Sequence, residues 1–119
     1  MTNVLLDAKA LSSLAVEALQ EKKGLNILRM DLRDADGSVT DFFVICSGTS
    51  DRHVQALADS VLEFLRNSGE RPHNKEGIDK GEWILLDYIN VVVHIFQKDT
   101  REFFRLEDLW GDAKFERIE

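Results

Sequence analysis

The chain has 119 residues, of which 44% are hydrophobic and 31% charged, and its formal net charge is −7 at pH 7. This length and composition fit one domain over residues 1–119, with one core that needs no disulfide or structural metal. Binding through phosphate neutralisation needs a concentrated basic surface, and no run of the sequence is richer in cations than Glu21-Lys22-Lys23. Specific recognition of DNA or RNA is therefore disfavoured, although a small local basic patch remains compatible with the composition.

The single cysteine, Cys46, lies in an apolar run, so no intramolecular disulfide is possible and a reducing compartment is indicated. We expect its thiol to be buried rather than reactive. The N-terminal residues lack the basic segment and apolar stretch of a secretion signal, and they are not rich in arginine and serine. No stretch approaches the length of a membrane span. We therefore expect a cytoplasmic protein without a membrane segment.

The first half of the chain shows a helical pattern followed by two strand patterns. Apolar residues at helical spacing predict a helix from an N-cap at Asn3 to a stop at residues 22–24. Residues 25–32 alternate as a strand does, and residues 34–38 have the composition of a turn. Residues 41–46 are apolar on both faces, which predicts a strand in the centre of a sheet.

A second helix and an irregular segment follow. Ser47-Gly48-Thr49-Ser50 ends the central strand, and apolar residues at the 3.6-residue period predict a helix from Asp51 to Gly69. Residues 70–82 contain the only proline and many charged or amide side chains. We interpret this segment as a surface excursion with room for one short strand.

The last third of the chain predicts a hairpin and a helix. Residues 83–88 and 91–97 are strand-like and two residues apart, which is hairpin spacing. Asp99 and Glu102 have the spacing of a capping box, so we expect a helix over residues 100–110. The order of elements predicts an α+β fold, a mixed sheet of about five strands flanked by helices.

The loop at residues 47–50 has two interpretations. Free backbone N–H groups at the start of a helix can bind an anion, which would suit a nucleotidyltransferase-like or phosphate-binding enzyme. The loop lacks the lysine of a Walker loop, and Ser or Thr before a helix is the usual N-cap. Nucleotidyltransferases also gather carboxylates around a divalent metal, whereas Asp31, Asp34 and Asp36 lie on or beyond a different strand. Capping is the favoured interpretation, and the enzyme is the alternative.

The sequence gives little support to a metal site or a catalytic nucleophile. A zinc site needs ligands at short spacing along the chain, and this spacing is absent among the three histidines and the cysteine, which are His53, His73, His94 and Cys46. A catalytic couple of Cys46 and His94 across adjacent strands would need an exposed thiol and a third orienting group. A hydrogen-bonded His94 on one face of its strand is the favoured interpretation, so we expect no catalytic residue, cofactor or metal ligand.

Aromatic residues gather in the hairpin and the predicted last helix. Alternation places Trp83, Leu85 and Asp87 on one face of the first hairpin strand, and Ile84, Leu86 and Tyr88 on the other. The helix would carry a stripe of Phe103, Leu106 and Trp110, with Phe104 beside it. Aromatic and arginine side chains among carboxylates are typical of a protein-binding hot spot. The alternative, that each tryptophan completes the core, stays open.

Two segments carry family motifs. Residues 40–58 contain Thr-Asp before an apolar strand, then Ser-Gly-Thr-Ser, Arg-His-Val and Ala-Leu-Ala. Residues 83–110 contain Trp, Asp-Tyr, Val-x-Val-His-x-Phe, Arg-x-Phe and Leu-Glu-x-Leu-Trp. Together they resemble the Iojap family, the ribosomal silencing factors, over nearly the whole chain.

The resemblance implies a small dimeric domain with a nucleotidyltransferase-like sheet that lacks the catalytic carboxylates. It implies binding to ribosomal protein L-fourteen on the large subunit, a steric block of the small subunit and repression of translation when nutrients are scarce. Organellar relatives act in large-subunit assembly. The residues that the resemblance assigns to the partner surface are Trp83, Asp87, Tyr88, His94, Arg101, Leu106 and Trp110.

The sequence departs from the family at two places. The hairpin turn is often Gly-Asp in the family and is Ile89-Asn90 here, and Phe104 stands where tyrosine is common. Because a β-branched residue resists positive φ, a two-residue type I′ turn centred on Ile89 is not expected. The acidic balance agrees with the implied function, since an acidic domain is attracted to basic ribosomal proteins and repelled by bare RNA.

Overall fold

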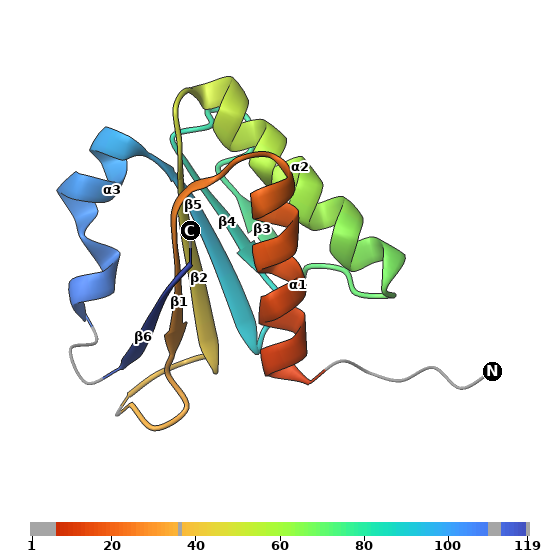
Figure 1. Ribbon diagram of the computed structural model, residues 1–119, viewed down its shortest axis with the longest axis vertical. Coiled ribbons are helices and arrows are strands. Elements are labelled where there is room, and N and C mark those ends of the chain that lie inside the picture. Colours follow the sequence, from red (N-terminus) through yellow and green to blue (C-terminus); the bar gives the residue numbers. More distant parts are fainter. Residues whose placement is uncertain (1–6, 36, 110–112, 119) are drawn as a thin grey trace.

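The computed structural model describes residues 7–35, 37–109 and 113–118, and it confirms the α+β fold. A six-stranded sheet has the helices α1 (Ala8–Glu21) and α2 (Asp51–Asn67) on one face (Figure 1). On the other face lie α3 (Lys98–Phe104) and the short 3₁₀ helix η1 (Leu106–Leu109). The two faces are therefore covered very unequally.

The sheet is mixed, as predicted, and has one strand more than the sequence suggests. Its strands are β1 (Leu25–Asp31), β2 (Phe42–Gly48), β3 (Asn74–Glu76), β4 (Trp83–Asp87), β5 (Val91–Gln97) and β6 (Lys114–Ile118). Their spatial order is β3-β4-β5-β2-β1-β6, in which β2 and β5 are parallel and all other neighbours antiparallel. The short strand expected within residues 70–82 is β3. The strand missed is β6, most of whose side chains are exposed and charged.

Two cores lie on opposite faces of the sheet. The larger one packs α1 and α2 against the sheet, and the smaller one lies between the sheet and Leu106 of η1. All seven residues of β2 are buried, which confirms the prediction of a central strand. Cys46 is fully buried in the larger core, as expected for a structural thiol.

The starts of the first two helices are set by side-chain caps. Asp7 is the N-cap of α1, and its carboxylate accepts from the backbone N–H of Ala10 at 2.7 Å. The N-cap predicted at Asn3 is therefore wrong, and Asn3 itself lies outside the described residues. Ser50 is the N-cap of α2, where its hydroxyl accepts from the backbone N–H of His53 at 3.1 Å. This confirms the capping interpretation of Ser50.

The predicted last helix is wrong in its boundaries. It begins at Lys98 after an N-cap at Gln97 that makes no side-chain bond, so the capping box does not form. It ends at Phe104, because Arg105 adopts φ of 47° and its N–H bonds to the Arg101 carbonyl. This left-handed turn redirects the chain into η1 and lets Leu106 reach the smaller core. Phe103 in α3 and Leu106 in η1 therefore do not share one helical stripe, and the third residue predicted for it, Trp110, lies outside the described residues.

Candidate partner-binding surface

The hairpin strand β4 presents alternate side chains to the two faces of the sheet, as predicted. Ile84 and Leu86 are fully buried beneath α1 and α2, and Tyr88 joins the same core. Trp83 and Leu85 face the opposite side, where α3 and η1 leave part of the sheet uncovered, and both are only partly buried. Among the described residues, this is the more open face of the sheet.

Trp83 is the centre of an aromatic cluster on this open face. Its indole Nε1 donates to Nδ1 of His94 at 3.1 Å. Its ring stacks on Phe96 at 4.8 Å and meets Phe104 at 4.9 Å. Phe104 in turn contacts Phe103 edge-on at 5.1 Å, and these two phenylalanines are 49% and 81% exposed. We call Trp83, Leu85, Phe103 and Phe104 the aromatic surface.

His94 supports Trp83 from within the sheet. It is 4% exposed, and the edge-on contact with Phe43 has a ring separation of 4.8 Å. Burial lowers the pKa of His94 to about 4, so the imidazole is neutral at pH 7. Because Nδ1 accepts from Trp83, the proton of the neutral ring is on Nε2, which is buried and has no partner among the described residues. His94 is a hydrogen-bonded sheet residue that fixes the Trp83 indole.

A hollow lies beside Trp83 at the edge of the sheet. It measures about 250 Å³ and is lined by Glu76, Gly77, Trp83 and Leu85. Gly77 has φ of +79°, and a Cβ there would lie 2.0 Å from the Trp83 carbonyl oxygen. Any larger residue would therefore displace the strand that carries Trp83.

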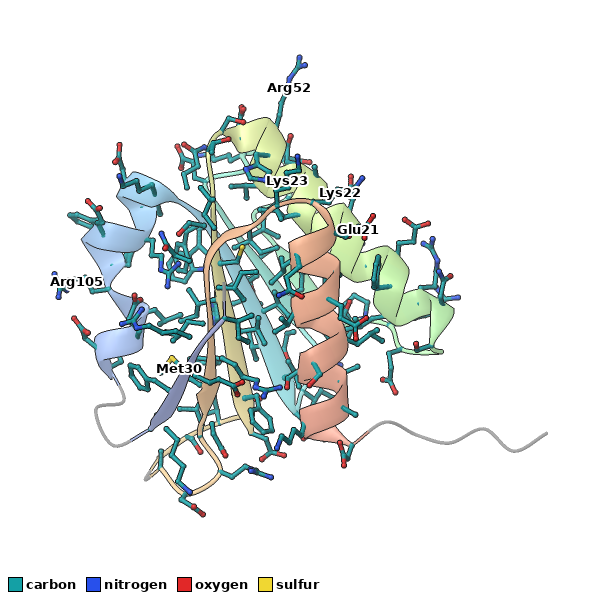
Figure 2. All side chains as sticks on the ribbon, viewed as in Figure 1. Glu21, Lys22, Lys23, Met30, Arg52 and Arg105 are labelled. Carbon is teal, nitrogen blue, oxygen red and sulfur yellow. The ribbon has the colours of Figure 1, made fainter. Side chains whose placement is uncertain are left out.

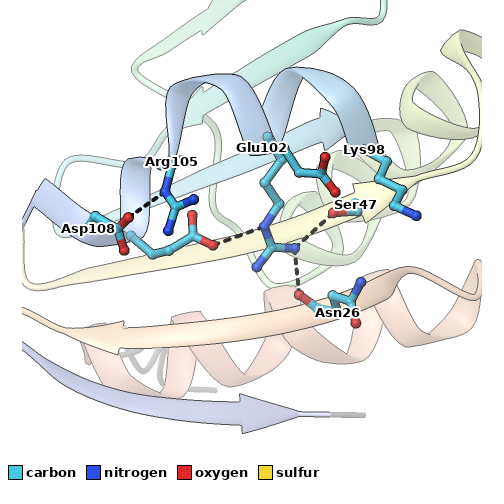
Figure 3. A pocket seen from close by; sticks show the side chains of 8 residues that line it. Asn26, Ser47, Lys98, Glu102, Arg105 and Asp108 are labelled. Atoms are coloured by element: carbon cyan, nitrogen blue, oxygen red, sulfur yellow. Dashed lines mark hydrogen bonds and ion pairs between the residues drawn. The ribbon is translucent and has the colours of Figure 1, made fainter.

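Arg101 joins α3 to the sheet. Its side chain is 9% exposed, and Nη1 donates to the Asn26 carbonyl at 2.7 Å and to the Ser47 hydroxyl at 2.8 Å (Figure 3). Its Nε donates to the Glu107 carboxylate at 3.4 Å. The hollow around it measures about 280 Å³, and its charged lining consists of Lys98, Arg101, Arg105, Glu102, Glu107 and Asp108. Cations and carboxylates are equal in number there, so the hollow has no net charge to select an ion.

The sequence-derived partner residues divide into exposed and buried groups. Trp83 and Asp87 are partly exposed, whereas Tyr88, His94, Arg101 and Leu106 are each less than a tenth exposed. The seventh sequence-derived partner residue, Trp110, lies outside the described residues. The sequence-derived set did not include Leu85, Phe103 or Phe104. For Phe103 and Phe104 the usable signal was their adjacency, because neighbouring residues on a short helix point in different directions and cannot both be buried against the sheet.

The hairpin turn confirms that no type I′ turn forms. Ile89 has φ of 74°, but Asn90 does not have positive φ, as a type I′ turn would require. The Asn90 N–H bonds to the Tyr88 carbonyl at 2.9 Å, and the Asp87 carboxylate accepts from the Ile89 N–H at 2.8 Å. A β-branched residue is held here in a conformation that it ordinarily avoids.

The loop at residues 47–50 uses its polar groups internally. The Thr49 N–H donates to Nδ1 of His53 at 2.9 Å, and Nε2 of the same ring lies 2.8 Å from the Lys22 carbonyl. Ser50 caps α2, as described above. An anion would have to displace the His53 ring from Thr49. The geometry therefore favours capping over phosphate binding.

Cys46 and His94 do not form a catalytic couple. In the parallel register Cys46 lies opposite Ile95, and His94 lies opposite Ile45, so the two side chains occupy opposite faces of the sheet. Burial raises the pKa of the Cys46 thiol to about 12. Within residues 7–35, 37–109 and 113–118, no group of three or more His, Cys, Asp or Glu could hold a metal ion. No helix in these ranges is long and apolar enough to cross a membrane.

These features define a class of protein: a small α+β domain whose exposed aromatic surface is supported by buried polar residues. The family model described as "Ribosomal silencing factor during starvation" matches residues 6–119. The ribosomal silencing factor RsfS of Bacillus subtilis is 38% identical over 108 residues, which cover 91% of each chain. The chain belongs to the ribosomal silencing factor family.

Two further relatives extend the comparison. A crystal structure of a protein from Chromobacterium violaceum superposes with a TM-score of 0.86 at 34% identity, covering 96% of this chain and 94% of that one. A mouse protein named for mitochondrial assembly of the ribosomal large subunit is 38% identical over 80 residues, or 65% of this chain and 35% of its own length. The family names denote regulatory and assembly factors rather than enzymes.

Proposed function

We propose that this protein silences ribosomes by binding ribosomal protein L-fourteen on the large subunit and blocking the small subunit. The observation that carries the proposal is the aromatic surface, where Phe103 is 81% exposed beside a fixed Trp83 in a chain of the silencing-factor family. Exposed aromatic clusters of this kind mark protein interfaces. The protein acts as one domain, without catalysis, in the cytoplasm.

The charge of the chain supports a basic partner. A formal net charge of −7 attracts basic ribosomal proteins over a distance and raises the association rate. Steric blocking then needs no chemistry, because two large surfaces cannot close over many contacts with a folded domain between them. In this proposal Trp83 and Asp87 contact the partner, and Trp110 does so from outside the described residues. Tyr88, His94, Arg101 and Leu106 hold that surface in place.

Sedimentation with separated subunits tests the proposal. The protein should co-sediment with free large subunits and not with small ones. Added before the subunits are mixed, it should lower the yield of joined ribosomes, whereas added afterwards it should do little. Equal binding to both subunits would refute the proposal. A rise in melting temperature with nucleotide and magnesium would instead support the enzyme alternative.

We also propose that the free protein is a homodimer. Among the described strands, β3 and β6 are the edges of the sheet and each has one unpaired side, and open edges tend to be covered by a second copy. Light scattering across micromolar concentrations should report twice the mass of one chain. A monomer of 13.6 kDa throughout would contradict this.

A further inference from the structure

Three cationic side chains gather where α2 ends and β3 begins. Arg66 lies in the last turn of α2, Arg71 in the following loop and Lys75 in β3. They line one hollow of about 290 Å³ together with Leu62, Glu70 and Pro72. We call Arg66, Arg71 and Lys75 the basic hollow. These three residues are several positions apart in the sequence, so they do not form a basic run that sequence analysis would detect.

The cations of the basic hollow are not neutralised by the protein. All three are exposed, and none takes part in an ion pair or side-chain hydrogen bond within the described ranges. The five cations that do have carboxylate partners there are Arg29, Arg33, Arg101, Arg105 and Lys114. With Glu70 as the single carboxylate of the lining, the hollow is a cationic spot on a strongly acidic chain.

The basic hollow and the aromatic surface lie on the two sides of one sheet edge. In the β3–β4 register Lys75 pairs with Leu86, whose side chain is buried beneath the helices. The next residue, Glu76, pairs with Leu85 and lines the hollow beside Trp83. Since neighbouring strand residues point to opposite faces, Lys75 and Glu76 project to opposite sides of the edge. A partner held at Trp83 therefore leaves the basic hollow uncovered and free for a second contact.

We infer that the basic hollow binds backbone phosphates of ribosomal RNA on the large subunit while the aromatic surface holds the ribosomal protein. The inference rests on the proposed function and adds a second, RNA-directed contact to it. Arginine presents a planar fork of donors that matches phosphate oxygens, and lysine adds a point charge. No aromatic side chain lines the hollow to stack on a base, so the contact holds the backbone and reads no sequence.

Salt dependence of binding tests the inference. The dissociation constant for large subunits is measured from 50 to 200 mM potassium chloride for the wild type and for the triple variant R66Q/R71Q/K75Q. Each lost phosphate contact should reduce the slope of log K against log salt by about 0.7–0.9. Across this fourfold salt range the wild type should therefore lose roughly 20- to 40-fold more affinity than the triple variant. The single variant Lys75→Gln should show about one third of the change in slope.

A matched control has the same charge change at the other end of α2. Lys22, Lys23 and Arg52 lie where α1 ends and α2 begins (Figure 2), and no ion pair in the described ranges involves them. Fourteen residues of helix separate Arg52 from Arg66, or about 20 Å at the rise of an α-helix. The variant K22Q/K23Q/R52Q should keep the wild-type slope.

Binding to the isolated ribosomal protein separates the two proposals. If the triple variant binds isolated L-fourteen as the wild type does but has a reduced slope on subunits, the inference holds. If the wild type binds subunits and the triple variant keeps its slope, or the control loses as much, the inference is refuted and the proposed function stands. If the wild type binds neither subunits nor L-fourteen, both proposals fall.

Discussion

Phe103→Ala should separate binding from folding. The side chain is 81% exposed, and within the described ranges its ring contacts that of Phe104 at 5.1 Å. Surface truncations of this kind change the unfolding free energy by no more than about 0.5 kcal/mol. If a partner covers about 100 Å² of this ring, the loss of binding free energy is about 2.5 kcal/mol at 25 cal/mol per Å². That loss corresponds to a roughly 60-fold larger dissociation constant.

The assay pairs a melting curve with a titration of large subunits for each variant. Val39→Ala is the control, because Val39 is 83% exposed and belongs to the loop between β1 and β2 rather than to the aromatic surface. It should melt and bind as the wild type does. A Phe103 variant that melts normally and binds with wild-type affinity would show that the aromatic surface is not the interface. Equal losses in both variants would show that exposed apolar area in general drives the binding.

Three further outcomes follow from buried or strained groups. Arg101→Leu should lower the unfolding free energy by about 3 kcal/mol in a denaturant titration, because it leaves the Glu107 carboxylate, the buried Ser47 hydroxyl and the Asn26 carbonyl unpaired; a change below 1 kcal/mol would contradict the role of Arg101 in holding α3 on the sheet. Because burial lowers the pKa of His94 from 6.5 to about 4, its contribution to stability is complete above pH 6.5 and is lost as the pH falls towards 4. Wild type should lose about 3 kcal/mol over that window, and His94→Gln, which keeps an acceptor for Trp83, should lose less; parallel curves would refute this assignment. Ile89→Gly should raise the unfolding free energy by about 0.5–1 kcal/mol in the same titration, since relief of positive φ exceeds the entropy cost of glycine, and a loss of stability would contradict strain at this turn.

Local patterns were sufficient for the elements that form the centre of the fold. The strand β2 was predicted because its apolar run has no polar face, and α2 because Ser50 and a regular apolar period fix its start and its buried side. In contrast, β6 carries mostly exposed charged side chains and is defined by pairing with β1, far away in the sequence. The strand propensity of its residues alone does not predict such a strand.

The site was only partly predictable for a related reason. Alternation along β4 correctly separated Trp83 and Leu85 from the buried Ile84 and Leu86, but it did not show which of the two faces is open. The burial of Arg101 could not be foreseen, because arginine is rarely buried and its acceptors, the Asn26 carbonyl and the Ser47 hydroxyl, come from two distant strands. The end of α3 was missed because Arg105 adopts positive φ without a glycine to signal it.

The position of β6 has a consequence for how the protein folds as it is synthesised. One neighbour of β1, the strand β2, emerges soon after it, but the other neighbour is the last described element of the chain. Until residues 114–118 leave the ribosome, the outer side of β1 remains unpaired, and Arg29 lacks the Glu116 carboxylate that it binds in the finished sheet. A chain in which β6 has not yet paired therefore has an open strand edge on β1 that chaperones can bind.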